Sequence, residues 1–233
     1  MSLHSGVDAQ TQLDGEQRLL SVPRAAPTLA LWEATPSLIV GVREMRAPRA
    51  IPAAAKMAAA GWPVVVRRSG GSAFPLAAGV LNISWITHAP TNIDVGYRQF
   101  CQAIIRALEP FGLPISVGPT PGSFCDGRYN LMVDGQKIAG TSQQWRRLPG
   151  NQVRCLYHCG LLVDVAAPDL VDTVNCFYRE AEAPADSAVD AAVIAAMSDF
   201  SPTCTVNNTA SLLRRVFAEI THNIPTENLQ RQL

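Results

Sequence analysis

The sequence predicts an α/β or α+β domain in which helices flank a mixed, largely antiparallel sheet. Three observations lead to this fold class. Short apolar runs bounded by turn residues alternate with segments of helical spacing, without the regular spacing of βαβ units. Hairpin signals concentrate in the middle of the chain. The 233 residues, of which 48% are hydrophobic, also suffice to bury a sizeable core.

Turn and breaker residues divide the first half of the chain. Pro23 follows the first helical pattern, Pro52 suits the first turn of the second helix with Gly61 as its stop, and Pro110 follows the third. Predicted helices cover residues 8–20, 52–60 and 97–108, and predicted strands cover residues 28–32, 37–41, 63–67 and 79–86.

The second half begins with a hairpin and ends in helices. A strand is expected over 152–164, and helices over 170–181, 188–197 and 208–220, with Asn207 or Asn208 as the cap of the last one. We therefore expect one domain over residues 8–220 and a polar, fraying tail over residues 221–233.

The charge and cysteine content narrow the possible partners. Nineteen basic and nineteen acidic residues give zero formal charge, so we expect no nucleic-acid partner and no membrane partner. The longest apolar stretches also fall short of the ~20 residues that a membrane span needs. Six cysteines without a CxxC pair, and no apolar signal segment near the start, lead us to expect a reducing cytoplasm.

The central hairpin supplies the first candidate site. Asp134-Gly135 suits a two-residue type I′ turn, which pairs Val133 with Gln136 and Met132 with Lys137. The same register pairs Leu131 with Ile138 and Asn130 with Ala139. One face then carries core residues, and the other forms a candidate pocket wall: Arg128, Asn130, Met132, Lys137 and Ala139. Gly140 beside it leaves room for a ligand, and Lys137 supplies a positive charge.

Cys125 lies in the loop Gly122-Ser-Phe-Cys-Asp-Gly127 that leads into this hairpin. Such a loop can expose a thiol, and a nearby Lys137 would favour the reactive thiolate. The alternative interpretations are a small buried apolar cysteine and a solvated strand lysine.

A second candidate site follows the strand over 63–67. Gly70 and Gly71 allow a close backbone approach to a ligand, and Arg67 can hold a carboxylate or a phosphate. A plain turn is the alternative. In the strand over 79–86, alternation places Asn82 and Ser84 on one face.

Two further patterns of ligating side chains occur on the strand over 152–164. Cys155 and Cys159 would lie roughly 13 Å apart along a strand, too far to share one metal ion. His158 faces the opposite side, as either a hydrogen-bonded strand histidine or a residue beside the substrate.

Segments 66–73, 79–82 and 134–143, in this order and spacing, resemble the lipoate-protein ligase A family of the wider biotin/lipoate transferase group. The resemblance covers roughly residues 10–220 as a single catalytic domain. It implies a class II synthetase-like or biotin-ligase-like sheet, an acyl cradle and a lysine that holds the carboxyl-derived group. The implied substrate-binding residues are Arg67, Ser69, Gly70, Gly71 and Asn82, to which the hairpin adds Asn130 and Gly140, and the implied catalytic lysine is Lys137.

Departures from the ligase pattern indicate which branch of the family this chain resembles. Ser72 stands where ligases carry a third glycine, and Leu76-Ala77 stands where they carry a His-Asp pair. The cysteine loop is more similar to octanoyl and lipoyl amidotransferases, which implies Cys125 as the nucleophile. The implied partners are lipoyl carrier domains of the glycine cleavage H protein or 2-oxoacid dehydrogenase E2 type.

Three functions therefore compete. The first is a Cys125 acyltransferase that moves an octanoyl or lipoyl group and requires no cofactor. The second is an ATP-dependent lipoate ligase, which uses ATP and Mg and in which Cys125 is incidental. The third is a non-catalytic protein that binds the acyl group or the carrier.

Overall fold

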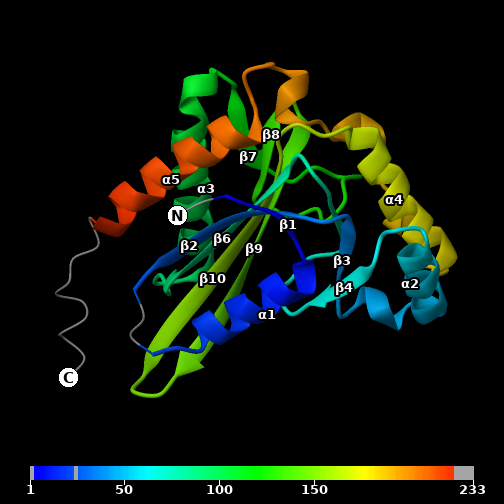
Figure 1. Cartoon of the computed structure of the whole chain (residues 1–233), viewed down its shortest axis with the longest axis horizontal. Coiled ribbons are helices and arrows are strands. Elements are labelled where there is room, and N and C mark those ends of the chain that lie inside the picture. The colour runs from blue at the N-terminus through cyan, green and yellow to red at the C-terminus, as the bar shows by residue number, and fades with distance from the viewer. Residues whose placement is uncertain (1–2, 24–25, 223–233) are drawn as a thin grey trace.

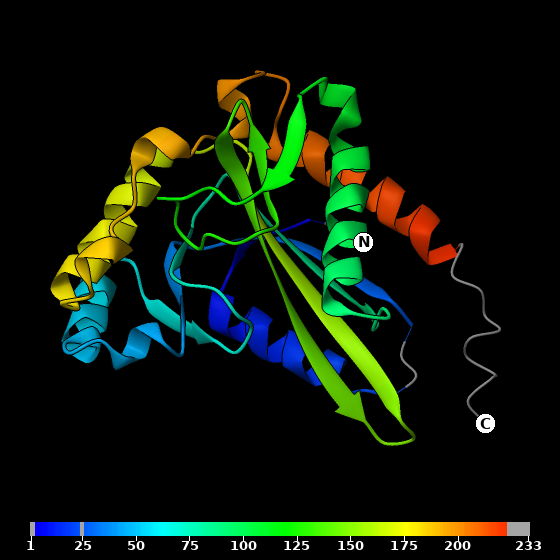
Figure 2. The same ribbon diagram turned by 180° about the vertical axis from the view of Figure 1, so that it is seen from behind.

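The computed structural model describes residues 3–23 and 26–222. Two sheets form the framework (Figures 1 and 2). The larger has the strand order β1-β2-β6-β10-β9-β8-β7 and the smaller has the order β4-β3-β5. The strands of the larger sheet are β1 (His4–Val7), β2 (Thr28–Ala34), β6 (Val80–His88), β7 (Ile115–Gly118), β8 (Asn130–Val133), β9 (Gln136–Leu148) and β10 (Gln152–Leu162). The smaller sheet contains β3 (Ser37–Gly41), β4 (Val64–Arg67) and β5 (Phe74–Leu76).

The expected mixed, largely antiparallel sheet is confirmed. From β2 to β7 every neighbouring pair of the larger sheet is antiparallel, and only β1 joins β2 in parallel. In the smaller sheet β3 pairs with β4 in parallel and with β5 in antiparallel fashion.

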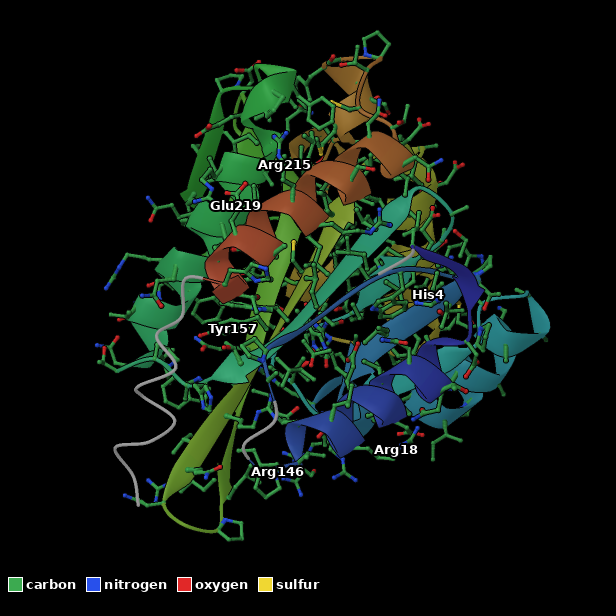
Figure 3. All side chains as sticks on the ribbon, turned by 60° about the vertical axis from the view of Figure 1, so that its left-hand side comes forward. His4, Arg18, Arg146, Tyr157, Arg215 and Glu219 are labelled. Atoms are coloured by element: carbon green, nitrogen blue, oxygen red, sulfur yellow. The ribbon has the colours of Figure 1, made fainter. Side chains whose placement is uncertain are left out.

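The helices cover the larger sheet on both sides. They are α1 (Ala9–Leu20), α2 (Ala50–Ala59), α3 (Ile93–Leu108), α4 (Ala167–Glu180) and α5 (Val206–His222). On one face α3 and α5 pack over an aromatic cluster of Trp85, Phe100, Tyr157 and Phe217. Figure 3 shows α5 with Arg215 and Glu219 on its exposed side. The opposite face is covered by α1 and by the smaller sheet with α2 and α4.

The turn of the central hairpin and its first two pairs, Val133 with Gln136 and Met132 with Lys137, form as expected, but the register shifts beyond them. Asp134 and Gly135 both have positive φ, at 49° and 80°. Beyond Met132 a β-bulge inserts Ile138, so Leu131 pairs with Ala139 and the expected pairs of Leu131 with Ile138 and Asn130 with Ala139 are wrong. Ala139 therefore packs in the core rather than in the pocket wall.

The bulge also places Gly140 on the face of Lys137. An ideal Cβ at Gly140 would lie 3.3 Å from both Cε and Nζ of Lys137. A single inserted residue thus decides which small residue lies beside the lysine.

Other boundaries also differ from the expectations. Residues 188–197 do not form a helix. A 3-10 turn at Ala191–Val193 is followed by an extended segment that leads to a second 3-10 turn at Met197–Asp199, because Ile194 and Ala195 pair with Lys137 of β9. The cap of α5 is Thr205, whose hydroxyl accepts from the backbone N–H of Asn208. Strands β1, β5 and β7 were not expected, and neither was the full length of β9.

At the C-terminal end α5 includes Thr221 and His222, so the tail does not begin at residue 221. Residues 223–233 lie outside the described residues. Within the described residues, no helix has the length and apolar character needed to cross a membrane.

Candidate active site

Two rows of paired residues form the floor of the candidate site on the larger sheet. The first row runs across four strands through Trp32, Asn82, Gly160 and Gly140. The second row runs through Ala30, Ser84, His158 and Ser142. Directly paired residues point to the same face of a sheet, so these eight residues all face α1 and the smaller sheet. The register of β10 thereby confirms that His158 lies opposite Cys155 and Cys159.

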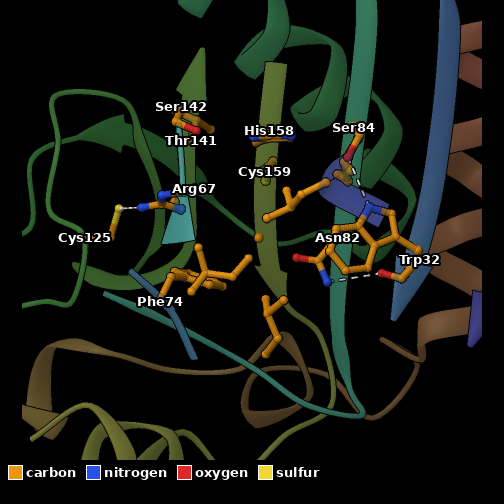
Figure 4. Close-up of a pocket in the computed structure, with 16 residues that line it drawn as sticks. Trp32, Arg67, Phe74, Asn82, Ser84, Cys125, Thr141, Ser142, His158 and Cys159 are labelled. Carbon is orange, nitrogen blue, oxygen red and sulfur yellow. Dashed lines mark hydrogen bonds between the residues drawn. The ribbon is translucent and has the colours of Figure 1, made fainter. Parts of the chain in front are cut away.

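A small cavity lies above this floor (Figure 4). Its volume is about 40 Å³, and it reaches from Cys125 and Arg67 to Asn82 and Trp32. Of the expected site residues, Arg67, Asn82, Cys125 and Gly140 line it directly.

Cys125 lies at one end of the cavity in the loop expected from the sequence. The residue is 9% exposed and has a positive φ of 50°, an uncommon conformation for a non-glycine residue. Its backbone N–H donates to the hydroxyl of Ser72 at 2.9 Å, which connects the loop to the segment between β4 and β5.

Arg67 contacts the thiol directly. Its Nη2 lies 3.1 Å from Sγ of Cys125 and also donates to the carbonyl of Ser72 at 2.7 Å. Arg67 thus has the cysteine as a partner within the chain, and its expected role of holding a carboxylate or phosphate of a ligand stays a prediction. Its burial at 9% exposure keeps water from weakening this contact.

These surroundings make Cys125 acidic. Burial alone would raise the pKa of the thiol, but the charges of Arg67 and Lys137 and the hydrogen bonds from Arg67 and Ser72 lower the pKa below its ordinary value of 9.0. The opposite holds for Cys155, because burial raises the pKa of its thiol to about 12. Cys125 is thus the thiol with the environment of a nucleophile.

Lys137 is fully buried and contacts the backbone of the cysteine loop. Its Nζ donates to the carbonyls of Phe124 at 2.6 Å and Cys125 at 2.9 Å, with the hydroxyl of Ser123 at 3.5 Å. Burial lowers the pKa of Lys137 to about 8, although Cys125 and Asp126 act in the opposite direction. Lys137 therefore positions the cysteine loop and supplies a positive charge near the thiol of Cys125.

The two glycines after β4 have different surroundings. Gly71 has a φ of 106°, and a side chain there would meet Arg67 Nη2 and Cys125 Sγ. Gly70 has no atom within 4 Å of an ideal Cβ. Only Gly71 is therefore required for the contact between arginine and cysteine.

Asn130 lies outside the cavity lining. Its Nδ2 donates to Asp126 at 2.7 Å, and Asp126 in turn accepts from the N–H of Thr120. The structure thus places Asn130 as an anchor of the cysteine loop, and its expected role in substrate binding stays a prediction.

A chain of polar side chains borders the floor. Ser69 Oγ lies 3.3 Å from His158 Nδ1, and His158 Nε2 lies 2.7 Å from Glu16 of α1. Glu16 also accepts from Ser84 at 2.5 Å, and Ser84 accepts from Trp32 Nε1 at 3.1 Å. Burial alone would raise the pKa of Glu16, but His158, Ser84 and Gln12 lower it below its ordinary value.

Glu16 and Trp32 were not among the expected site residues. A signal for Glu16 existed, because it follows Leu13 by three residues and precedes Leu20 by four, on the buried face of the first helix. Trp32 had no comparable signal, since only the pairing of β2 with β6 brings it to the cavity.

The described residues contain no group of three or more His, Cys, Asp or Glu side chains that could hold a metal ion. Cys155 and Cys159 belong to the core beneath α3 and α5. All six cysteines are free.

The fold is that of the lipoate-protein ligases. A crystal structure of lipoate-protein ligase A bound with ATP superposes with a TM-score of 0.74 at 20% identity, over 95% of this chain and 84% of that chain. At this level of identity the likeness shows the shared fold alone.

The sequence itself shows the family. The lipoyl protein ligase A/B catalytic domain matches residues 8–218, so the chain belongs to this family. This confirms the resemblance of the three motifs to the family.

Two bacterial proteins are similar to this chain in sequence. An octanoyl-[GcvH]:protein N-octanoyltransferase of Kyrpidia tusciae is 35% identical over 66% of this chain and 56% of its own length. An uncharacterized protein of Cupriavidus necator is 35% identical over 75% of each chain. The chain thus spans little more than half of the octanoyltransferase.

Proposed function

We propose that this chain is a protein acyltransferase that moves an octanoyl or lipoyl group to a lysine of a lipoyl carrier domain through a thioester on Cys125. The observation that carries the proposal is the contact of 3.1 Å between Arg67 and the buried thiol at the end of the cavity. A cationic partner and a lowered pKa are what a cysteine nucleophile needs. The name of the Kyrpidia tusciae relative supports the octanoyl group and a GcvH-type carrier.

The acyl transfer takes place in two steps. In the first, the Cys125 thiolate attacks the acyl carbonyl of the loaded carrier, a thioester bond forms, and the carbon–nitrogen bond to the carrier lysine breaks as its amine takes up a proton from solvent. In the second, a neutral lysine amine of the acceptor domain attacks the thioester. The carbon–sulfur bond then breaks, Cys125 leaves as thiolate, and the new amide loses a proton to solvent.

The structure supports this route over acyl-adenylate chemistry. Leu76, at one of the two positions where the ligases of the family carry a His-Asp pair, is fully buried in the apolar core that also contains Phe74 and Phe124. The proposal accordingly requires no cofactor, and ATP and Mg belong to the ligase alternative. Six free cysteines agree with a reducing compartment, and we place the protein in the cytoplasm.

Lys137 predicts a pH dependence of the transfer. The rate rises as the Cys125 thiol ionises, and it falls above about pH 8, where the buried lysine loses its proton and its charge. Lys137→Met is expected to remove the falling limb and to lower the maximal rate about a hundredfold, because the loop loses its support and the thiolate loses a cation. Single-turnover rates from about pH 6 to 10 measure both effects.

The matched control is the same substitution at Lys56, an exposed lysine of α2 that pairs with Glu180 at 2.6 Å. Lys56→Met should keep the wild-type pH profile. A falling limb that survives in Lys137→Met would show that another group causes it.

The decisive experiment is the intact mass of the wild-type protein after incubation with an octanoyl-loaded carrier domain in the absence of ATP. We expect an octanoyl increment that peptide mapping locates at Cys125 and that disappears when unloaded carrier is added. No increment, with labelling only from free octanoate or lipoate plus ATP, would discard the thioester route and leave the ligase. Binding of acyl group or carrier without any transfer would leave the non-catalytic alternative.

A further inference from the structure

The middle of the cavity floor carries no side chain. Gly160 and Gly140 are direct partners on β10 and β9, between Asn82 on one side and Lys137 on the other. Because neighbouring strands lie about 4.8 Å apart, two adjacent glycines leave a shallow trough across the sheet. This trough connects the region of Cys125 with Asn82 and Trp32 (Figure 4).

The ring of Phe74 fills this trough. Two of its ring carbons meet the position of an ideal Cβ at Gly160, and a third lies 3.8 Å from that of Gly140. On its other side the ring makes an edge contact with Phe124, whose centroid lies 5.2 Å away and which precedes Cys125 in the chain. Phe74 is 4% exposed, so its ring is enclosed between the trough and the cysteine loop.

The remaining space is too small for the acyl group. The cavity of about 40 Å³ is far smaller than the roughly 150 Å³ cavity that accommodates the six carbons of a benzene molecule. An eight-carbon chain needs several times this space, so at least one lining side chain must move before the chain can enter.

Phe74 is the lining side chain best placed to move. It belongs to β5, a strand of three residues at the edge of the smaller sheet that pairs only with β3. Its ring lies over glycines, so its departure opens a continuous trough next to Cys125. Asn82, Ser84 and His158, by contrast, are held on β6 and β10 in the middle of the larger sheet.

We propose that Phe74 closes the acyl site of this protein and sets the size of the acyl group that reaches Cys125. This inference rests on the proposed function, since it assigns the trough over Gly140 and Gly160 to the acyl chain. The ring leaves the trough when the acyl group enters, and the bulk that it retains limits how long that group can be.

The test measures calorimetric binding of octanoate, decanoate and dodecanoate to the wild-type protein, Phe74→Ala and Phe74→Leu. Each additional buried methylene strengthens binding about fourfold. We expect no gain beyond octanoate in the wild type, a gain of about tenfold or more from octanoate to dodecanoate in Phe74→Ala, and an intermediate gain in Phe74→Leu. The control is Leu170→Ala in α4, which removes a buried side chain of the same core away from the cavity and should keep the wild-type profile.

Equal chain-length profiles in the wild type and both Phe74 variants would overturn the inference, as would the absence of fatty-acid binding to all of them. Phe74→Leu keeps the test decisive if Phe74→Ala does not fold. Free fatty acids need no transfer to bind, so a chain-length effect without a Cys125 thioester would refute the proposed function and leave Phe74 as the residue that sizes the site.

The position of the Phe74 ring over Gly160 can be tested separately with the same variants. A methyl group at Gly160 collides with Phe74, because the three nearest atoms to its position all belong to that ring, so removal of the ring relieves the collision. Gly160→Ala is therefore expected to lower the unfolding midpoint of the wild-type protein and to have little effect in the Phe74→Ala background. A similar loss in both backgrounds would place the ring elsewhere.

Discussion

Cys125→Ala is expected to abolish the octanoyl adduct and to lower the rate of transfer at least about a thousandfold, because no other thiol of the site is activated. The substitution removes Sγ of Cys125. Among the described residues, this is the one sulfur atom that contacts Arg67 at the end of the cavity. Intact mass after incubation with loaded carrier, together with single-turnover transfer rates, measures the loss.

Cys155→Ala is the matched control for this prediction. Cys155 is fully buried and free, but it lies on the opposite face of the sheet from His158, and burial raises the pKa of its thiol to about 12. The control should acquire the octanoyl increment at the wild-type rate. ATP-dependent turnover that persists in Cys125→Ala would show that the cysteine is incidental and that the chain acts as a ligase.

Gly71→Ala is expected to cause the second large loss of transfer rate. It acts by changing the surroundings of the Cys125 thiol rather than the binding of the substrate. The added methyl group would meet both Arg67 Nη2 and Cys125 Sγ, and the φ of 106° strains any L-residue. Separation of the guanidinium from the sulfur should raise the pKa of Cys125 toward its ordinary value of 9.0 and lower the transfer rate about ten- to a hundredfold.

The same methyl group at Gly70 provides the steric comparison, since it has no atom within 4 Å. The pH dependence of thiolate absorbance, measured against a Cys125→Ala blank, reports the pKa of Cys125 in each variant. We expect a raised pKa in Gly71→Ala and a value near that of the wild type in Gly70→Ala. Equal pKa values in both variants would contradict the role of Gly71 as the contact point of arginine and cysteine.

Several features of the fold followed from local chemistry. The Asp134-Gly135 turn, the helix that begins after Asp8 and the alternation along β10 all depend on residues close together in the chain. Local patterns also singled out the loop of Cys125 and the lysine of the following hairpin. The error over residues 188–197 has the opposite origin, because that apolar segment is held extended by its pairing with Lys137, more than fifty residues earlier in the chain.

The sequence by itself thus determined the fold class, the family and the identity of the cysteine and lysine of the candidate site. Only the tertiary structure decided that Arg67 contacts the thiol, that Lys137 holds the loop backbone, and that the bulge at Ile138 brings Gly140 beside it. It also decided that Phe74 lies over Gly140 and Gly160. The physical reason is that turn and helix signals are local, whereas a site built across four strands depends on register and packing between distant segments.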